Sequence, residues 1–138
     1  MARRLLALTA GVMLVASGCR EQTDHSSSAT ATSTARPAST AVLDIVSPAA
    51  GATVTGSELK VEVSLQGAHV LGSTTTKLRP DEGHVHLSLD GQLQQMSYGL
   101  EQTVPVTPGN HVLQAEFVAG DHAPFFPRVI AVKRFSVR

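Results

Sequence analysis

From residue 42 onward, apolar and polar residues alternate with a period of two, and no segment there follows the period of a helix. The clearest alternation is in Leu59, Val61, Val63 and Leu65, which are separated by charged or polar residues. Because successive side chains of a strand point to opposite faces, this pattern predicts a strand with one face in the core.

Weaker alternation predicts six more strands, separated by short turns. Asp90-Gly91 is typical of a hairpin turn, and Pro108-Gly109 begins another turn. In the last strand we expect the alternation to slip near Lys133-Arg134. The six segments cover residues 42–47, 84–90, 93–97, 100–106, 111–118 and 128–137.

Seven short strands joined by turns predict an all-β fold, an antiparallel immunoglobulin-like β-sandwich. A small open barrel is the competing fold. The length of 138 residues allows one domain of ordinary size. The one Cys excludes an internal disulfide and a metal site built from several cysteines.

The first 19 residues are typical of a bacterial lipoprotein signal. Arg3 and Arg4 precede an apolar run over 5–16, which is shorter than the roughly 20 residues that a membrane-spanning helix needs. Small residues then lead to Cys19. This order resembles the lipobox of bacterial lipoproteins, which implies cleavage before Cys19 and a lipid on its sulfur that anchors the chain outside the cytoplasm. The alternatives are an ordinary cleaved signal peptide with an unpaired Cys, or a short buried helix.

Composition divides the rest of the chain into a tether and a domain. Residues 23–41 contain five Ser, five Thr and five Ala, which cannot bury a core. We therefore predict a signal peptide over 1–18, a lipidated Cys with a disordered tether over 19–41, and the immunoglobulin-like domain over 42–138.

Three short motifs resemble a known family. They are Gly83-His84-Val85-His86, the segment from Pro108 to Leu113, and Gly120-Asp121-His122. Together they are similar to a family of short secreted bacterial domains of unknown function, and the resemblance covers about residues 44–137. It implies an immunoglobulin-like fold and a location outside the cytoplasm, and it implies no activity. That family often has three consecutive His in the first motif, where this chain has Val85 in the middle.

Strand geometry brings several possible metal ligands together. In an immunoglobulin-type sandwich, the strands over 84–90 and 111–118 are antiparallel neighbours, so their outward side chains share one face. The loop after residue 118 returns to the end where the first of these strands begins. The predicted cluster consists of His84, His86, Glu116 and His122, with Asp121 either as an alternative ligand or as a hydrogen-bond partner of a ligand.

Two imidazoles one residue apart on a strand can reach the same ion, and this set of donors suits copper or zinc. The alternative is that His84 and His86 are structural or ordinary surface residues. Met96 is a soft donor for copper, with simple packing as its alternative. His111 shares the inward phase of Leu113, and we expect it to cap a turn by donating to a backbone carbonyl.

Phe125 and Phe126 lie between two prolines in the segment 123–127. If they are exposed, they form an apolar surface for a protein partner. If they are buried, they close the end of the sandwich, and the scarcity of Phe in the chain favours this arrangement.

The sequence gives little sign of nucleic-acid binding or catalysis. Net charge is zero and aromatic residues make up 4% of the chain, which argues against a nucleic-acid partner. No catalytic motif is present, so we predict that the protein is not an enzyme. The leading expectation is a membrane-anchored lipoprotein with a non-enzymatic binding or adaptor domain, and copper or zinc binding is the alternative.

Overall fold

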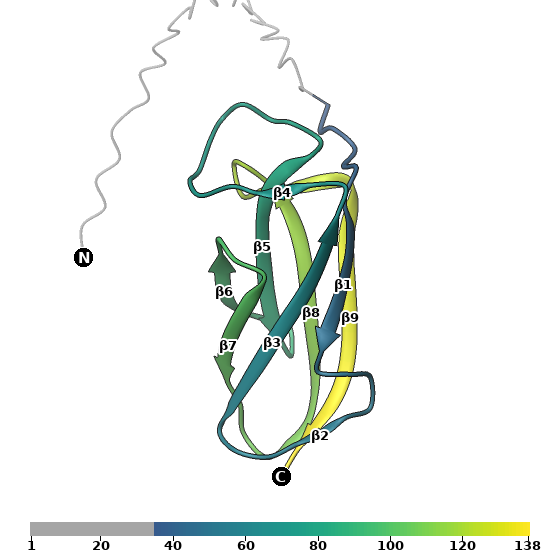
Figure 1. Ribbon diagram of the computed structural model, residues 1–138, viewed down its shortest axis with the longest axis vertical. Coiled ribbons are helices and arrows are strands. Elements are labelled where there is room, and N and C mark those ends of the chain that lie inside the picture. The colour runs from purple at the N-terminus through teal and green to yellow at the C-terminus, as the bar shows by residue number, and fades with distance from the viewer. Residues whose placement is uncertain (1–34) are drawn as a thin grey trace, which may run out of the picture. The chain divides into compact units, whose positions relative to one another are not determined.

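The computed structural model describes residues 35–138. None of these residues is helical, so the described part of the chain contains no helix able to cross a membrane. Strands run along the long axis, and the described chain begins at the end opposite the C-terminus (Figure 1). The strands are β1 (Val42–Ser47), β2 (Thr53–Val54), β3 (Glu58–Gln66), β4 (His69–Val70), β5 (Glu82–Leu89), β6 (Gln92–Ser97), β7 (Glu101–Pro105), β8 (Gly109–Ala119) and β9 (Pro124–Val137).

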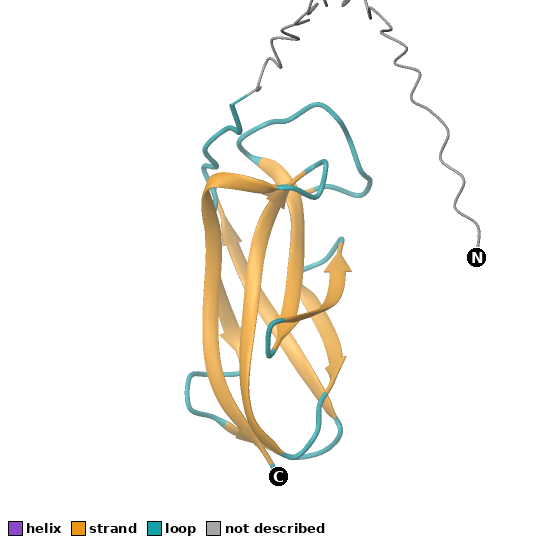
Figure 2. Cartoon of the chain, turned by 180° about the vertical axis from the view of Figure 1, so that it is seen from behind, coloured by secondary structure: helices purple, strands orange, loops and turns teal. Residues whose placement is uncertain are grey.

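The strands form two sheets, as the immunoglobulin-like prediction requires. One sheet has the order β1-β3-β7, and the other has the order β2-β9-β8-β5-β4, with β6 also pairing with β5. Figure 2 shows the long strands of the second sheet from behind, with most of the loops at the two ends. The all-β sandwich is therefore confirmed, and the separate pairing of the two sheets excludes the open barrel.

The antiparallel pairing of β5 with β8 is confirmed, with His86 directly opposite Glu116. Val85 and Phe117 also lie opposite each other, and both are completely buried between the sheets. The Asp90-Gly91 turn that follows β5 has positive φ at both residues, 52° and 80°, as a two-residue hairpin of this kind requires. The strand geometry therefore fixes which side chains of β5 face inward and which face outward.

The expected slip near Lys133-Arg134 is wrong. The register of β8 with β9 is continuous through both residues, and the irregularity lies instead between Phe117 and Val118. Lys133 has the inward phase of the strand, and its Nζ lies 3.0 Å from Oδ1 of Asp44. A long side chain can start on the inward face of a strand and still keep its charged end at the edge of the sandwich. The interruption of the apolar pattern at Lys133 is therefore explained by this ion pair and not by a change of register.

His111 caps a turn, as predicted. Its Nε2 lies 2.7 Å from the carbonyl oxygen of Thr107, and its Nδ1 lies 2.7 Å from Oδ2 of Asp90. The other carboxylate oxygen of Asp90 accepts the N–H of Val112 at 2.8 Å. The hydrogen bond to Asp90 raises the pKa of His111, and the Thr107 carbonyl adds to this effect. The doubly donating imidazolium therefore connects the β5–β6 turn to the start of β8.

This contact predicts a pH-dependent contribution to stability. Because the pKa of His111 is higher in the folded state than the usual 6.5, its contribution is complete below pH 6.5 and is lost as pH rises through the folded-state value. His111→Gln should lower the free energy of unfolding by about 1–2 kcal/mol at about pH 5.5 and by less at about pH 8.5. Urea unfolding of both proteins at the two pH values measures this difference.

Asp90→Asn provides the control. The pKa of Asp90 is lowered, chiefly by the N–H of Val112 and then by His111, so its carboxylate stays ionised over this pH range. In the Asp90→Asn background, the effect of His111→Gln should depend less on pH, because the Thr107 carbonyl alone then raises the pKa of His111. A pH dependence as large as that seen with Asp90 present would contradict the assignment to this pair.

Candidate functional site

The three predicted His of the cluster converge on the outer face of the larger sheet. His84 and His122 stack with ring centroids 4.3 Å apart and planes 7° from parallel. Nε2 of His86 lies 3.1 Å from Nδ1 of His122. Nε2 of His122 lies 3.0 Å from Oγ1 of Thr74, in the segment between β4 and β5. The loops that carry Thr74 and His122 therefore meet the beginning of β5.

His84 differs from the prediction in its exposure. It has the outward phase of β5, but its side chain is completely buried, because loops cover this end of the sheet. The ring of Tyr98 meets it edge-on at 5.1 Å. Neither ring nitrogen of His84 has a hydrogen-bond partner in the described structure. Such a buried polar group costs about 1–3 kcal/mol unless something satisfies it.

Two glycines of the sequence motifs allow this burial. A Cβ on Gly83 would lie 2.0 Å from the carbonyl oxygen of Val118. A Cβ on Gly120 would lie 2.5 Å from Cγ2 of Thr75, whose N–H donates to the Gly120 carbonyl at 2.9 Å. At Gly83 only glycine permits the approach without movement of the backbone, and a Cβ at Gly120 would displace the side chains of Thr75 and Leu71. The glycines therefore bring β5, β8 and the segment over 71–77 close enough to enclose His84.

Burial lowers the pKa of both His84 and His86, and the charge that His122 can carry lowers both further. For His84, the carbonyls of Gly120 and Leu71 oppose this shift, although neither is placed for a hydrogen bond. For His86, Glu116 opposes it. The two imidazoles are therefore neutral at pH 7, the form in which His binds metals.

Glu116 is not free to act as the predicted ligand. It lies opposite His86, but it accepts a hydrogen bond from Nε of Arg128 at 2.7 Å and a second from Nη2. In addition, no three His, Cys, Asp or Glu side chains within residues 35–138 are arranged to hold a metal ion. The predicted four-ligand set is therefore corrected to a cluster of three imidazoles without the carboxylate.

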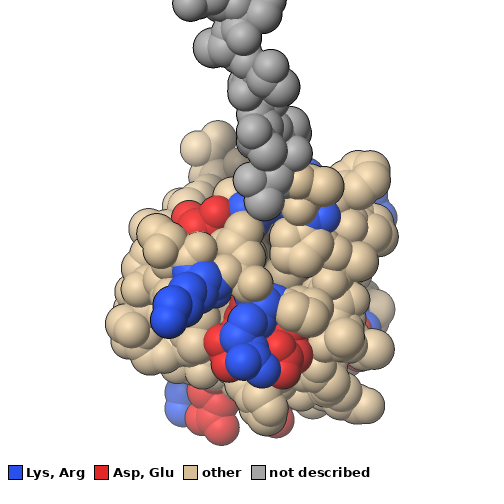
Figure 3. All heavy atoms as spheres, turned by 90° about the horizontal axis from the view of Figure 1, so that it is seen from above, with Lys and Arg blue, Asp and Glu red and all other residues tan. Residues whose placement is uncertain are grey.

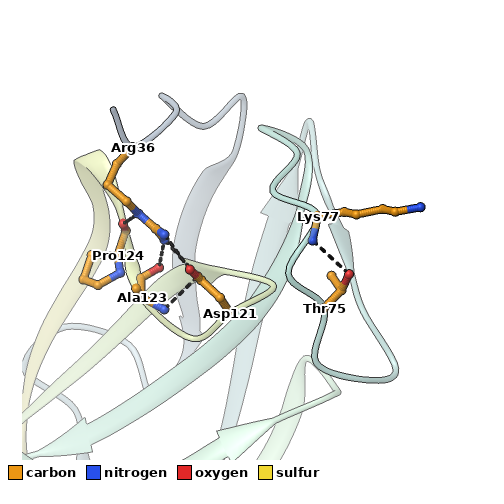
Figure 4. Close-up of polar contacts among 6 residues, drawn as sticks. All are labelled: Arg36, Thr75, Lys77, Asp121, Ala123 and Pro124. Carbon is orange, nitrogen blue, oxygen red and sulfur yellow. Dashed lines mark hydrogen bonds and ion pairs between the residues drawn. The ribbon is translucent and has the colours of Figure 1, made fainter. Parts of the chain in front are cut away.

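Asp121, the further ligand considered, is occupied by Arg36. The guanidinium of Arg36 donates to both carboxylate oxygens of Asp121 at 2.6 and 3.0 Å, and also to the carbonyls of Ala123 and Pro124 at 2.6 and 2.9 Å (Figure 4). The hydrogen bond from Arg36 is the main reason that the pKa of Asp121 is lowered. The hairpin that carries His122 is therefore attached to a residue 85 positions earlier in the chain.

The folded part of the chain begins before residue 42. Besides the contacts of Arg36, the carbonyl of Pro37 accepts the N–H of Phe126 at 3.2 Å, and the N–H of Thr40 donates to Pro80 at 3.0 Å. We call residues 36–41 the strap. The prediction that these residues belong to a disordered tether is wrong, because their backbone and side chains bind the domain. Cys19 and the predicted tether up to residue 34 lie outside the described residues.

Most charges at this end of the domain are paired. Figure 3, viewed from above, shows basic and acidic side chains next to one another. Arg36 pairs with Asp121, Arg128 with Glu116, and Arg79 lies 3.3–3.4 Å from two acidic residues. The surface around the His cluster therefore has no patch of a single sign in the part of the chain that is described.

Phe125 and Phe126 have different environments. Phe125 is 1% exposed and stacks on Phe117 with ring centroids 5.5 Å apart, so it is part of the core and not a partner-binding residue. Phe126 is 75% exposed. Both belong to β9, which begins at Pro124, earlier than predicted. The apolar surface proposed from the sequence is therefore reduced to Phe126.

Comparisons with known proteins agree with the fold. No protein-family model and no curated protein matches this sequence. Among solved structures, the chain is similar to a fibronectin(III)-like module of Clostridium thermocellum CbhA, with 16% identity over 70% of this chain and 94% of that chain, at a TM-score of 0.50. A CARDB domain from Pyrococcus furiosus matches with 15% identity over 73% of this chain and 96% of that chain, at a TM-score of 0.41. The chain thus shares the sandwich fold of the fibronectin(III)-like module, and the resemblance to the family of short secreted domains stays a prediction.

The two Phe environments predict opposite effects of substitution. Phe125→Ala should lower the free energy of unfolding by about 3–5 kcal/mol, because it leaves a cavity beside Phe117. Phe126→Ala should change it by less than about 0.5 kcal/mol, because the side chain is exposed. Thermal unfolding followed by circular dichroism measures both. Similar losses in the two variants would contradict the burial described here.

The strap predicts a stability contribution from Arg36. Arg36→Gln should lower the free energy of unfolding by about 1–2 kcal/mol, because it removes several charge-assisted hydrogen bonds to one hairpin. Arg79→Gln is the matched control, since the Arg79 side chain is 60% exposed and its ion pairs are longer. Urea unfolding of the two variants tests the difference, and equal effects would mean that the strap adds no more than a surface ion pair.

Proposed function

We propose that this protein is a membrane-anchored lipoprotein that presents its immunoglobulin-like domain outside the cytoplasm as a non-enzymatic binding or adaptor module. A lipid on Cys19 provides the anchor. The observation that carries the proposal is the order of basic, apolar and small residues that ends at Cys19, followed by a domain that Arg36 contacts near the beginning of the described residues. This arrangement is that of an anchor, a spacer and a displayed domain.

The strap marks the place where the chain that follows Cys19 meets the domain. Residues 20–35 separate Cys19 from Arg36. The strap meets the domain beside the hairpin that carries His122. The spacer therefore joins the domain at the end that bears the His cluster.

The pairing of polar groups supports a binding role over a catalytic one. Glu116 and Asp121 each form an ion pair with an arginine. Both nitrogens of His111 are also engaged, one by Asp90 and the other by the Thr107 carbonyl. A general acid or base must be able to reach a substrate and exchange a proton with it. Phe126, exposed beside the strap, is the residue that we propose for contact with a protein partner.

The anchor predicts a specific effect of Cys19. In bacterial cells supplied with radiolabelled palmitate, the wild-type chain should be labelled and should sediment with membranes. Cys19→Ala should lose the label and the membrane association, because the acyl chains provide the binding energy for the bilayer.

Ser17→Ala is the control, because it keeps a small residue before the cleavage site and leaves the Cys19 sulfur available. It should be labelled like the wild type. Labelling that persists in Cys19→Ala would refute the anchor, whereas membrane association without labelling would indicate attachment by an uncleaved signal segment.

A further inference from the structure

The contact between His86 and His122 has the spacing of two ligands on one metal ion. Their facing nitrogens, Nε2 and Nδ1, are 3.1 Å apart. Copper or zinc holds imidazole nitrogens at about 2.0–2.1 Å, so two neighbouring ligands of one ion are about 2.9–3.4 Å from each other. The two nitrogens are therefore already at the separation that one shared ion requires. Each ring would have to turn so that its lone pair points at an ion beside the line between the two nitrogens, in place of the hydrogen bond that joins them.

His122 is also oriented as a metal ligand is. With a proton on Nε2, its ring donates to Oγ1 of Thr74 at 3.0 Å, which leaves a lone pair on Nδ1 directed at His86. Metal-binding imidazoles usually donate their second N–H to a nearby acceptor, which fixes the tautomer and the ring plane. When an ion binds, the proton on Nε2 of His86 moves to its Nδ1, so no net proton needs to be released.

His84 gives a second and independent reason to expect a ligand at the cluster, because its ring nitrogens lack hydrogen-bond partners in the described structure. The side chain is also completely buried. Its ring lies parallel to that of His122, so its lone pair points past the gap between His86 and His122. Rotation of the ring out of the stack would direct a nitrogen towards an ion in that gap and remove the cost of the unpaired group.

The remaining donors favour copper over zinc. The carboxylates that zinc accepts are neutralised, Glu116 by Arg128 and Asp121 by Arg36. On the other side of β5, Met96 lies directly opposite His86 on the same face of the sheet, and its side chain is 55% exposed. Paired residues of this kind have Cβ atoms about 4.5–5.5 Å apart, so the thioether is within reach of an ion held by His86. Imidazole and thioether together suit copper.

We propose that His86, His122 and Met96, with His84 as the buried third imidazole, bind one copper ion on the outer face of the larger sheet. The role is binding, and no redox step is required. The proposal does not depend on the lipid anchor, because every donor comes from the domain. Loss of lipidation in Cys19→Ala and loss of copper binding are therefore separate results.

The test uses the full-length mature protein, purified in detergent without a histidine tag. Affinity for Cu(I) is measured by competition with bicinchoninate under reducing conditions, and affinity for Cu(II) and Zn(II) by calorimetry with glycine as a competitor. Three cluster variants are compared, with substitutions chosen to keep the fold. His122→Asn suits the positive φ of 63°, His86→Gln keeps a polar side chain, and His84→Phe keeps a stacked ring. Circular dichroism checks that each variant is folded.

The wild type should bind one copper ion, and bind it more tightly than zinc. Loss of a residue that only hydrogen-bonds to a metal ligand weakens metal binding by roughly 10–100-fold. Each cluster variant should weaken copper binding by more than this, because it removes a ligand itself. Met96→Leu should weaken Cu(I) binding by at least about tenfold and leave Cu(II) binding nearly unchanged, because the thioether is the soft donor. The matched control, His25→Asn with His69→Asn, removes two His outside the cluster and should bind copper like the wild type.

Three outcomes would overturn the proposal. One is the absence of stoichiometric copper binding by the folded wild-type protein. Another is equal copper affinity in the cluster variants and the control, which would place the bound ion elsewhere on the chain. The last is tighter binding of zinc than of copper, which would contradict the donor set.

Discussion

The antiparallel register of β5 and β8 is the constraint on which the core and the His cluster both depend. This register places Val85 against Phe117 inside the sandwich and His86 beside Glu116 on the outer face. A shift of one residue would exchange the two faces of β5 and expose the core side chains. The burial of Val85 and Phe117 therefore holds the outward side chains in place, although those side chains contribute little to the core themselves.

Close backbone approach then determines how much of the outer face is covered. Gly83 and Gly120 leave no space for a Cβ, so β5, β8 and the segment over 71–77 meet above the beginning of β5. This contact encloses His84 and brings His122 over it. The motifs that carry these glycines thus have a steric role in addition to supplying imidazoles, and the two roles act on the same end of the sheet.

Arginines decide the chemistry of that end. Arg36 and Arg128 each hold a carboxylate that would otherwise lie near the imidazoles. With both carboxylates engaged, the donors that remain are nitrogen and sulfur, which is why the proposed ligand is copper. The pair between Arg36 and Asp121 also connects the beginning of the folded chain to the hairpin of His122, so a ligand at the cluster and the attachment of the spacer share one structural element.

Much of this arrangement follows from the sequence by itself. Alternation predicted most of the strands and the inward side of β5, but it missed the short strands β2 and β4 and the beginning of β9 at Pro124. The Asp90-Gly91 pair predicted a hairpin, and the phase of His111 predicted that it caps a turn, because each of these depends on neighbouring residues. The convergence of His84, His86 and His122 also followed from the pairing that the fold class implies. The tertiary structure alone decided that His84 is buried, that Arg128 binds Glu116, and that Lys133 forms an ion pair. It also decided that Phe125 is buried while Phe126 is exposed, and that the strap binds the domain. Each of these depends on contacts between residues distant in the chain or on how much space a neighbouring segment leaves, and a local pattern of polar and apolar residues carries no information about either.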